Sequence, residues 1–234
     1  WQKPQRVSEG KYFTGFTRWI SEAVRRRPPV NHWTAYESVV EFLRFENLDE
    51  NPEVRDIAVR YFMSDDQALR VGFPGHPEVS VVQEPSVVPL PDGRLFTVMR
   101  TSRGNPFWTL SADAGVTWSE PEVLRCADDG EAMLHPLSPC PLYPLGDGRY
   151  LFLFHNHDGH FQQWGPYDTR FHRRPIYAAL GTVHPGDRQP LRFSAPRLLM
   201  DNDGVALGYG SGRADMAMYA SFTIRNGRRV LWYP

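Results

Sequence analysis

The densest group of side chains that could do chemistry is the segment His155-Asn156-His157-Asp158-Gly159-His160. Imidazoles and a carboxylate can ligate a metal ion or exchange protons with a substrate. In a β-strand His155 and His157 would face the same side, as two ligands of one metal would. The pair Asp158-Gly159, however, is typical of a turn. We therefore expect a polar loop with no metal and no cofactor, in which His155 contacts a bound substrate.

The elements that must position such side chains are indicated by an internal repeat. The segment Val87–Phe96 recurs 55 residues later as Leu142–Leu151, and a weaker copy, Ser221–Leu231, begins 79 residues after the second. Each copy has an apolar run, Asp-Gly-Arg or Asn-Gly-Arg, and a second apolar run, which predicts a hairpin with a tight turn. The segment Glu41–Met63 is expected to add an earlier pair of strands around a polar loop.

The spacing of these hairpins predicts the fold class. Turns in a β-sandwich usually recur every 8 to 12 residues, whereas 55 and 79 residues fit radial blades of about four strands each. We expect an all-β chain, folded as a single β-propeller domain over residues 1–234, with material for about four blades. A closed ring of six would need further sequence or a second chain. We expect little regular structure in residues 1–33.

Composition excludes several classes of partner. With 26 basic and 27 acidic side chains and no basic run longer than Arg25–Arg27, the chain is not expected to bind nucleic acid. No stretch approaches the roughly 20 apolar residues of a membrane span. Cys126 and Cys140 are predicted to be unpaired thiols, with a single bridge as the less favoured alternative. The oligomeric state stays open.

One eight-residue motif is specific. Residues 111–118 follow the pattern Ser-x-Asp-x-Gly-x-Thr-Trp, which resembles the Asp-box, or BNR repeat, of the sialidase (neuraminidase) superfamily. Ser111 and Asp113 can bond to the backbone of their own turn, Gly115 can take a conformation that a Cβ would forbid, and Trp118 can pack underneath. The expected role is structural, so Asp113 is not a candidate acid.

The resemblance also implies an active site. The stretch from Glu84 to Arg100 resembles the sialidase segment that carries a glutamate and, 16 residues later, an arginine. Glu84 precedes one strand and Arg100 ends its hairpin partner, so both can emerge at the same end. In the family this glutamate activates a tyrosine nucleophile, and the arginine binds the carboxylate of the substrate.

Two further segments are similar to family motifs. Residues 173–180 resemble the segment with another carboxylate-binding arginine, for which Arg174 is preferred and Arg173 is the reserve. Residues 218–222 look like the short motif that carries the nucleophile, which would be Tyr219. The family's first clamp arginine and its aspartate acid have no counterpart here, which fits either blades upstream of Trp1 or an altered chemistry.

The resemblance implies a glycoside hydrolase of the exo-α-sialidase type, extracellular or periplasmic, that releases a terminal sialic or related acidic sugar. Two other functions remain open, because propellers host several activities. One is a polysaccharide lyase on uronic-acid glycans, in which Tyr219 or His155 moves the proton. The other is a non-catalytic glycan-binding propeller, in which aromatic residues such as Trp164 and Tyr167 stack on sugars.

Overall fold

The chain is all-β, as the sequence predicts. The computed structural model describes residues 3–28, 30–168, 173–205, 216 and 218–233, and regular structure in these ranges consists of strands and four single-turn 3-10 helices. The 3-10 helices are η1 (Trp33–Ala35), η2 (Leu48–Glu50), η3 (Val54–Asp56) and η4 (Asp65–Gln67). Within the described part, no helix is long and apolar enough to cross a bilayer.

The strands form successive antiparallel sheets in which, with the exception of the last strand of the third sheet, neighbours in sequence are neighbours in space. The first sheet has the order β1 (Gln5–Ser8), β2 (Lys11–Trp19), β3 (Ser38–Phe45), β4 (Val59–Phe62). The second contains β7 (Val82–Pro89), β8 (Leu95–Thr101), β9 (Phe107–Ser111) and β10 (Glu122–Val123). The third contains β11 (Leu142–Gly146), β12 (Arg149–Phe154), β13 (Ile176–Val183) and β14 (Leu191–Phe193), with β15 (Arg197–Met200) also paired to β13. Two hairpins complete the set, β5–β6 (Gly72–Phe73, His76–Ser80) and β16–β17 (Ser221–Arg225, Arg228–Trp232).

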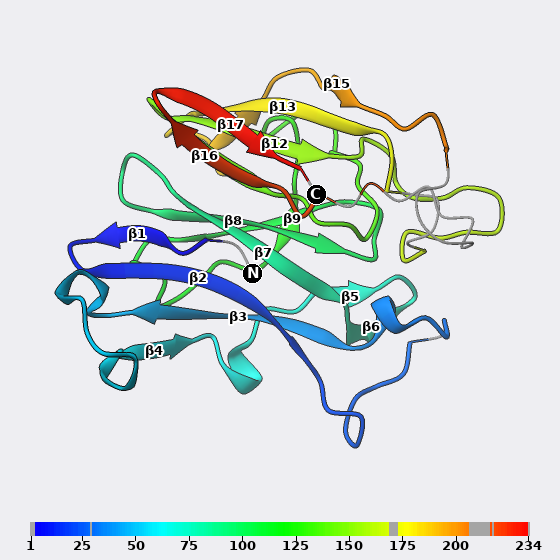
Figure 1. Ribbon diagram of the computed structural model, residues 1–234. Coiled ribbons are helices and arrows are strands. Elements are labelled where there is room, and N and C mark those ends of the chain that lie inside the picture. Colours follow the sequence, from blue (N-terminus) through cyan, green and yellow to red (C-terminus); the bar gives the residue numbers. More distant parts are fainter. Residues whose placement is uncertain (1–2, 29, 169–172, 206–215, 217, 234) are drawn as a thin grey trace.

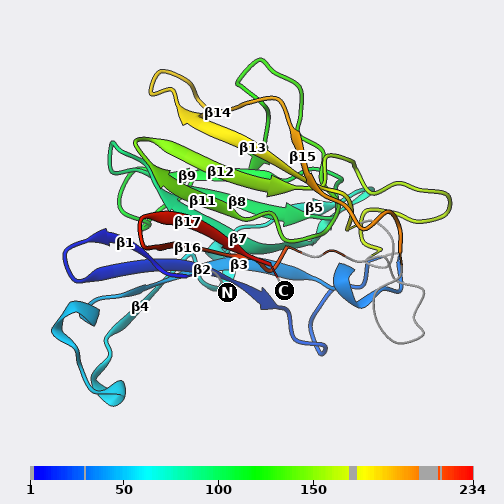
Figure 2. The same cartoon turned by 45° about the horizontal axis from the view of Figure 1, so that its top comes forward.

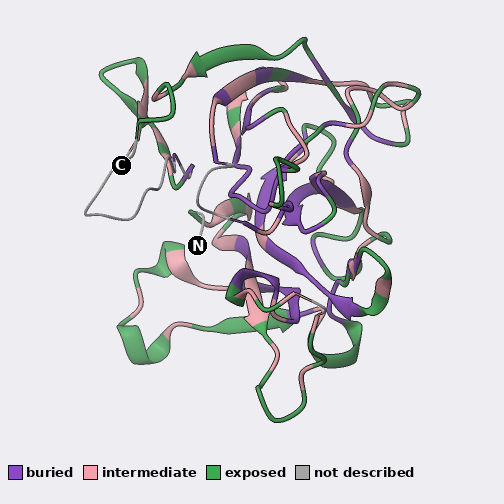
Figure 3. Ribbon diagram, turned by 90° about the vertical axis from the view of Figure 1, so that its right-hand side faces the viewer, coloured by how far each residue is buried: buried purple, intermediate pink, exposed green. Residues whose placement is uncertain are grey.

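The second sheet lies between the first and the third (Figures 1 and 2). Strand β8 explains how one sheet serves two cores. Leu95 and Met99 pack toward the first sheet, and Phe96 and Val98 pack toward the third. Because successive side chains of a strand point to opposite faces, an uninterrupted apolar run is needed when both faces are covered. Figure 3 shows the resulting concentration of buried residues at the centre of the molecule.

All three repeated segments are hairpins, as predicted. They are β7–β8, β11–β12 and β16–β17, and the glycine in each turn has a positive φ: 88° at Gly93, 69° at Gly148 and 73° at Gly227. The expected pair of strands within 41–63 is β3–β4. The assignment of little structure to residues 1–33 is wrong, because β1 and β2 lie there and β2 pairs with β3 from Tyr12 to Trp19.

The turn after β9 has the geometry expected for its motif. Asp113 accepts bonds from the Thr117 amide at 2.9 Å, the Thr117 hydroxyl at 2.6 Å and Ser111 Oγ at 2.8 Å. Gly115 has φ +88°, and the indole of Trp118 stacks on Phe42 of β3 at 4.2 Å. The motif therefore fastens the second sheet to the first, and Asp113 is occupied by this structural role.

Candidate functional site

A cleft of about 290 Å³ opens where several elements converge. It is bounded by β2, by the start of β7, by β8 and β11, and by the segment that precedes β16. Its lining consists of Gly15, Phe16, Thr17, Trp19, Glu84, Pro85, Arg100, Pro139, Cys140, Pro141, Tyr143, Met218, Tyr219 and Ala220. Three of the five residues predicted from the sequence for a site, namely Glu84, Arg100 and Tyr219, are in this set.

Glu84 reaches the cleft because β7 bulges at this point. The register to β8 shifts between Gln83 and Ser86, which leaves Glu84 and Pro85 outside the regular ladder, and Glu84 has a φ of 49°. A bulge re-aims a side chain, and proline is tolerated there since no ladder donor is required. The amide of Glu84 donates to Thr17 Oγ1 at 2.8 Å, so β2 holds the bulge in place.

Arg100 is buried and its guanidinium is fixed on two sides. Nε and Nη2 both donate to Gln83 Oε1, at 3.1 and 2.8 Å, and Nη1 lies 2.9 Å from Glu84 Oε2. The amide of Gln83 in turn donates to the Thr34 carbonyl at 2.9 Å and to Ser38 Oγ at 3.1 Å. The carboxylate of Glu84 therefore has a cation held rigidly behind it.

Tyr219 contacts Glu84 from the solvent side, opposite Arg100. Its hydroxyl donates to Glu84 Oε1 at 3.2 Å, and the side chain is 59% exposed. The neighbours of Tyr219 anchor it: Met218 is buried, and the Ala220 carbonyl accepts a 2.5 Å bond from the Tyr143 hydroxyl. An exposed phenol is thus held against a carboxylate that comes from 135 positions earlier in the chain.

The remaining wall of the cleft is neutral. Burial raises the pKa of Tyr143 to about 12, and burial also raises the pKa of the Cys140 thiol, so both stay protonated at neutral pH. Cys140 and Cys126 are both free thiols. Among the lining residues, Glu84 and Arg100 carry the charges, and they neutralise each other. The arrangement can remove a proton from Tyr219 and present its oxygen to an electrophile.

Arg174 lies outside the cleft lining. Its Nε and Nη2 donate to the two oxygens of Asp201 at 2.9 and 2.7 Å, a bidentate pair that fixes the guanidinium. The reserve residue Arg173 is buried and donates to the Leu137 carbonyl at 3.3 Å. The structure therefore does not bring either arginine to Tyr219 and Glu84.

His155 is also not part of the cleft. It is fully buried, its Nδ1 donates to the Pro175 carbonyl at 2.9 Å, and its Nε2 lies 2.9 Å from Ser138 Oγ. His157 bonds through Nε2 to the Arg174 carbonyl at 2.9 Å. Burial lowers the pKa of His155 well below its ordinary value, so it is a neutral core residue.

Among the residues that shape the site but were not predicted from the sequence, Tyr143 and Trp19 line the cleft and Gln83 lies behind Arg100. Gln83 orients Arg100, Tyr143 anchors the segment of Tyr219, and Trp19 lines the wall. The one available signal was the pair Gln83-Glu84 directly after Val81 and Val82, since two polar residues at this position must find partners when the strand is buried.

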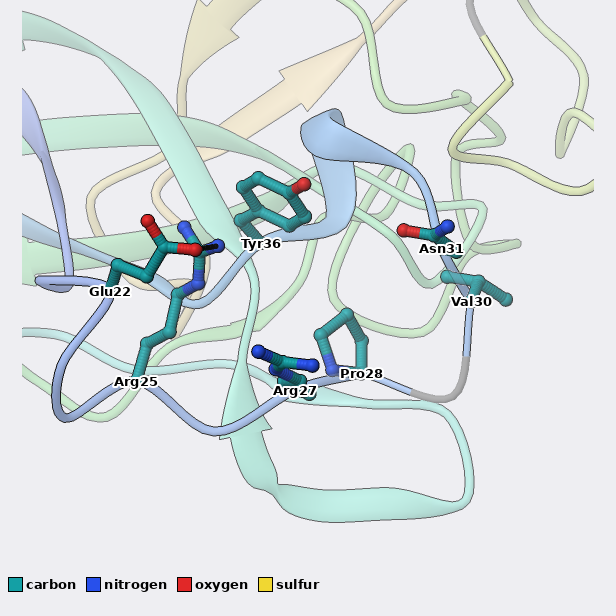
Figure 4. Close-up of a pocket in the computed structure, with 7 residues that line it drawn as sticks. All are labelled: Glu22, Arg25, Arg27, Pro28, Val30, Asn31 and Tyr36. Carbon is teal, nitrogen blue, oxygen red and sulfur yellow. Dashed lines mark hydrogen bonds and ion pairs between the residues drawn. The ribbon is translucent and has the colours of Figure 1, made fainter.

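A second hollow, of about 360 Å³, lies beside the loop before η1 (Figure 4). There the guanidinium of Arg25 lies 4.0 Å from the centre of the Tyr36 ring and pairs with Glu22 at 3.3 Å. These three side chains thus interact with one another within one surface loop. In this hollow the described side chains do not form a series of hydroxyl, carboxylate and guanidinium like that in the cleft. The cleft is therefore the candidate site.

Comparisons with known proteins give limited information. A scan against protein-family models finds no match, and a search of curated proteins finds none. Among solved structures, the chain is similar to the crystal structure of a protein of unknown function from Dyadobacter fermentans DSM 18053. The two are 15% identical with a TM-score of 0.45, over 82% of this chain and 39% of that chain. The chain therefore spans well under half the length of this neighbour.

Proposed function

We propose that the cleft binds and hydrolyses a glycoside of an acidic sugar, with Tyr219 as the nucleophile and Glu84 as its base. The observation that carries the proposal is the hydrogen bond from Tyr219 to Glu84 together with the ion pair between Glu84 and Arg100. Three residues singled out by their resemblance to sialidase motifs meet in one cleft. The proposed activity is of the exo-α-sialidase type, on a terminal sialic or related acidic sugar.

The proposal includes the architecture. The successive antiparallel sheets stack face to face, and the cleft takes residues from the first sheet, the second, the third and the segment before the β16–β17 hairpin. Consecutive sheets that share one site are typical of blades around a propeller axis. We therefore propose that these sheets are blades of a six-bladed, sialidase-type propeller.

Two displacements make up the proposed reaction. First, Tyr219 Oη bonds to the anomeric carbon while its proton passes to Glu84 Oε1, and the bond to the leaving oxygen breaks with its electron pair on that oxygen. Water then attacks the same carbon while the bond from this carbon to Tyr219 Oη breaks with its electron pair on Oη, and Tyr219 regains a proton from Glu84. The proton lost by the water neutralises the leaving alkoxide in the net reaction. Two inversions retain the anomeric configuration.

A phenol suits an anionic substrate. A carboxylate nucleophile would repel the carboxylate of the sugar, whereas neutral Tyr219 becomes negative only as its proton leaves. Arg100 lines the cleft and has an Nη1–Glu84 contact of 2.9 Å, so its positive charge supports the carboxylate at the start of the reaction. As Glu84 takes up the proton, this charge becomes available to the substrate carboxylate.

The leaving group determines which substrate tests the proposal best. Among the described residues that line the cleft, Glu84 is the one carboxylic acid, and it is committed to Tyr219. An alkyl leaving group needs a proton from an acid, but a nitrophenol or methylumbelliferone leaves as a stable anion. Aryl glycosides therefore test the nucleophile and its base without depending on a separate acid.

The test is turnover of aryl α-glycosides of N-acetylneuraminic acid and of uronic acids, measured for the parent chain, Tyr219→Phe and Glu84→Gln. We expect both substitutions to lower kcat/KM roughly 100-fold or more. Tyr61→Phe is the matched control, because Tyr61 is an exposed tyrosine on β4 outside the cleft lining. Undiminished turnover by Tyr219→Phe, or a product of inverted configuration by NMR, would contradict the proposal.

A lyase acting on uronic-acid glycans is the second candidate, and the single carboxylic acid of the described lining favours it. In β-elimination the deprotonated Tyr219 would take the proton beside the sugar carboxylate. The bond to the neighbouring glycosidic oxygen would then break with its electron pair on that oxygen, which takes the proton that Glu84 had removed from Tyr219, leaving a carbon–carbon double bond. The product absorbs in the ultraviolet, so absorbance during incubation with polyuronates separates the two reactions. Binding without either product would indicate a non-catalytic glycan receptor.

A further inference from the structure

Two tryptophans form an exposed aromatic surface that begins at the wall of the cleft. Trp19 ends β2 and lines the cleft, and Trp33 begins η1. Their ring centroids are 6.3 Å apart at an angle of 39°, and 42% of Trp19 and 59% of Trp33 are exposed. A pair of large apolar rings left in water beside a polar cleft is typical of a ligand-binding surface.

Trp33 is held in position by the residues on either side of it. The imidazole of His32 stacks on its ring at 6.4 Å, and His32 Nδ1 lies 2.7 Å from Thr34 Oγ1. Thr34 is buried, and its hydroxyl donates to the Tyr167 carbonyl at 2.7 Å. The two residues on either side of Trp33 therefore fix the backbone that carries the exposed ring.

The same loop is bonded to the catalytic candidate residues. The Thr34 carbonyl accepts from Gln83 Nε2, and Gln83 Oε1 accepts from Arg100. One buried amide therefore joins the turn that carries Trp33 to the guanidinium behind Glu84. The distance between the aromatic surface and the cleft is thus set by the core, as a ligand that occupies both would require.

We propose that Trp19 and Trp33 form a stacking platform for the sugar rings attached to the scissile sugar, so that the substrate is an oligosaccharide. This inference rests on the proposed function, in which the terminal sugar binds in the cleft. The C–H face of a pyranose packs against an indole, and burying it displaces water from both apolar surfaces. The platform thus corresponds to the leaving-group side of the substrate.

The cation beside Trp19 in sequence is already paired, which favours neutral sugar rings over a second acidic group at this point. Arg18 forms an ion pair with Glu41. Its guanidinium therefore offers little attraction to a further anion. The expected ligand is an acidic terminal sugar linked to neutral hexoses.

Binding is the direct test, measured by calorimetry in the Tyr219→Phe background so that nothing is hydrolysed. The probes are sialyllactose, an acidic sugar on a neutral disaccharide, and the methyl α-glycoside of sialic acid, which lacks the disaccharide. We expect sialyllactose to bind more tightly, and Trp33→Ala to weaken it about three- to tenfold while leaving the methyl glycoside unchanged. Trp33→Phe keeps a ring and should retain part of the difference.

The matched control is Phe161→Ala, because Phe161 is an equally exposed aromatic residue, at 56%, that does not line the cleft. Equal affinity for the two probes, equal weakening of both by Trp33→Ala, or the same loss in Phe161→Ala would overturn the platform. Failure of the proposed function is a separate result. It would appear as absence of aryl-glycoside turnover by the parent chain, with tight sialyllactose binding that still depends on Trp33.

Discussion

A stacked pair of buried histidines should make the fold sensitive to mild acid. His135 and His155 lie ring on ring at 5.3 Å with 3° between their planes, and both are fully buried. His135 Nε2 donates to the Ser138 carbonyl, and His135 Nδ1 accepts from the His155 amide. His155 Nδ1 donates to the Pro175 carbonyl, which leaves Nε2 to accept from Ser138 Oγ. Every ring nitrogen is thus satisfied in the neutral form, and a further proton would find no acceptor.

The sign of the effect follows from the pKa shifts. Burial lowers the pKa of His135 to about 3 and that of His155 well below its ordinary value, and the nearby positive charge of Arg173 acts in the same direction. The unfolded chain takes up a proton near pH 6.5, whereas the folded chain excludes it. The stabilisation is therefore complete above about pH 6.5 and is lost between about pH 6.5 and about 3.

The magnitude can be worked out for each histidine. One pKa unit corresponds to about 1.4 kcal/mol, so at pH 5 each buried histidine has lost about 2 kcal/mol of stability and the pair about 4 kcal/mol. Carboxylates with lowered pKa values, such as Asp113, titrate below pH 5 and so outside the range from pH 7.5 to pH 5. The change between pH 7.5 and pH 5 therefore reports mainly on the histidines.

Urea unfolding followed by tryptophan fluorescence measures this change. We expect the parent chain to lose about 4 kcal/mol between pH 7.5 and pH 5, and His155→Gln and His135→Gln to lose about 2 kcal/mol each. His160→Gln is the control, because it removes an exposed histidine instead of a buried one. The reasoning is refuted if the parent chain loses less than about 1 kcal/mol, or if both core variants keep its full pH dependence.

Three further substitutions probe other parts of the structure. Gly115→Ala should destabilise the chain by roughly 2–4 kcal/mol in urea unfolding, because φ is +88° and a Cβ would lie 2.2 Å from a phenylalanine ring. Arg174→Gln should change stability by less than about 1 kcal/mol and leave the calorimetric affinity for the methyl sialoside unchanged, since Arg174 is bound to Asp201; a tenfold loss would show that it reaches the ligand. Tyr143→Phe should lower kcat about fivefold with KM little changed, because the Ala220 carbonyl beside the nucleophile loses a hydrogen-bond donor worth about 1 kcal/mol. An unchanged kcat would contradict this anchoring role.

The hairpins could be predicted from the sequence because their information is local. Asp-Gly and Asn-Gly supply positive φ angles that few other residues accept, so the turns at Gly93, Gly148 and Gly227 are specified by two or three letters each. The strands β1 and β2 were missed for the opposite reason. The arginine triplet and two prolines that follow dominate residues 1–33, while the strand-forming run 11–19 is interrupted by Gly15.

Gly15 has a tertiary reason that no local rule contains. A Cβ there would lie 2.5 Å from Pro85 Cγ, so the glycine allows the bulge of β7 to approach β2. The bulge itself could not be predicted from the sequence either. The 16-residue interval between Glu84 and Arg100 correctly placed both at one end of a hairpin, but the shift in register that turns Glu84 outward depends on packing between two sheets.

The site residues also differ in whether the sequence alone could identify them. Glu84, Arg100 and Tyr219 were named through motif resemblance and do meet. Arg174 was named in the same way and His155 from the cluster of histidines around it, and both lie elsewhere. An arginine or a histidine is recognised in a sequence by type alone. Its role depends on which carboxylate or carbonyl it bonds to in the folded chain. These partners come from loops that are distant in the sequence.

The burial of the three cleft residues fits the roles proposed for them. Arg100 is buried, Glu84 is half-buried and Tyr219 is exposed, so the charge is held in the core while the reactive hydroxyl meets solvent and ligand. Gln83 fixes the buried end, and the same amide holds the loop of Trp33. Because this side chain has both a donor and an acceptor engaged, it couples the orientation of Arg100 to the position of the aromatic surface. The cleft and the platform are therefore parts of one rigid unit, and an oligosaccharide that spans both would bind without reordering either.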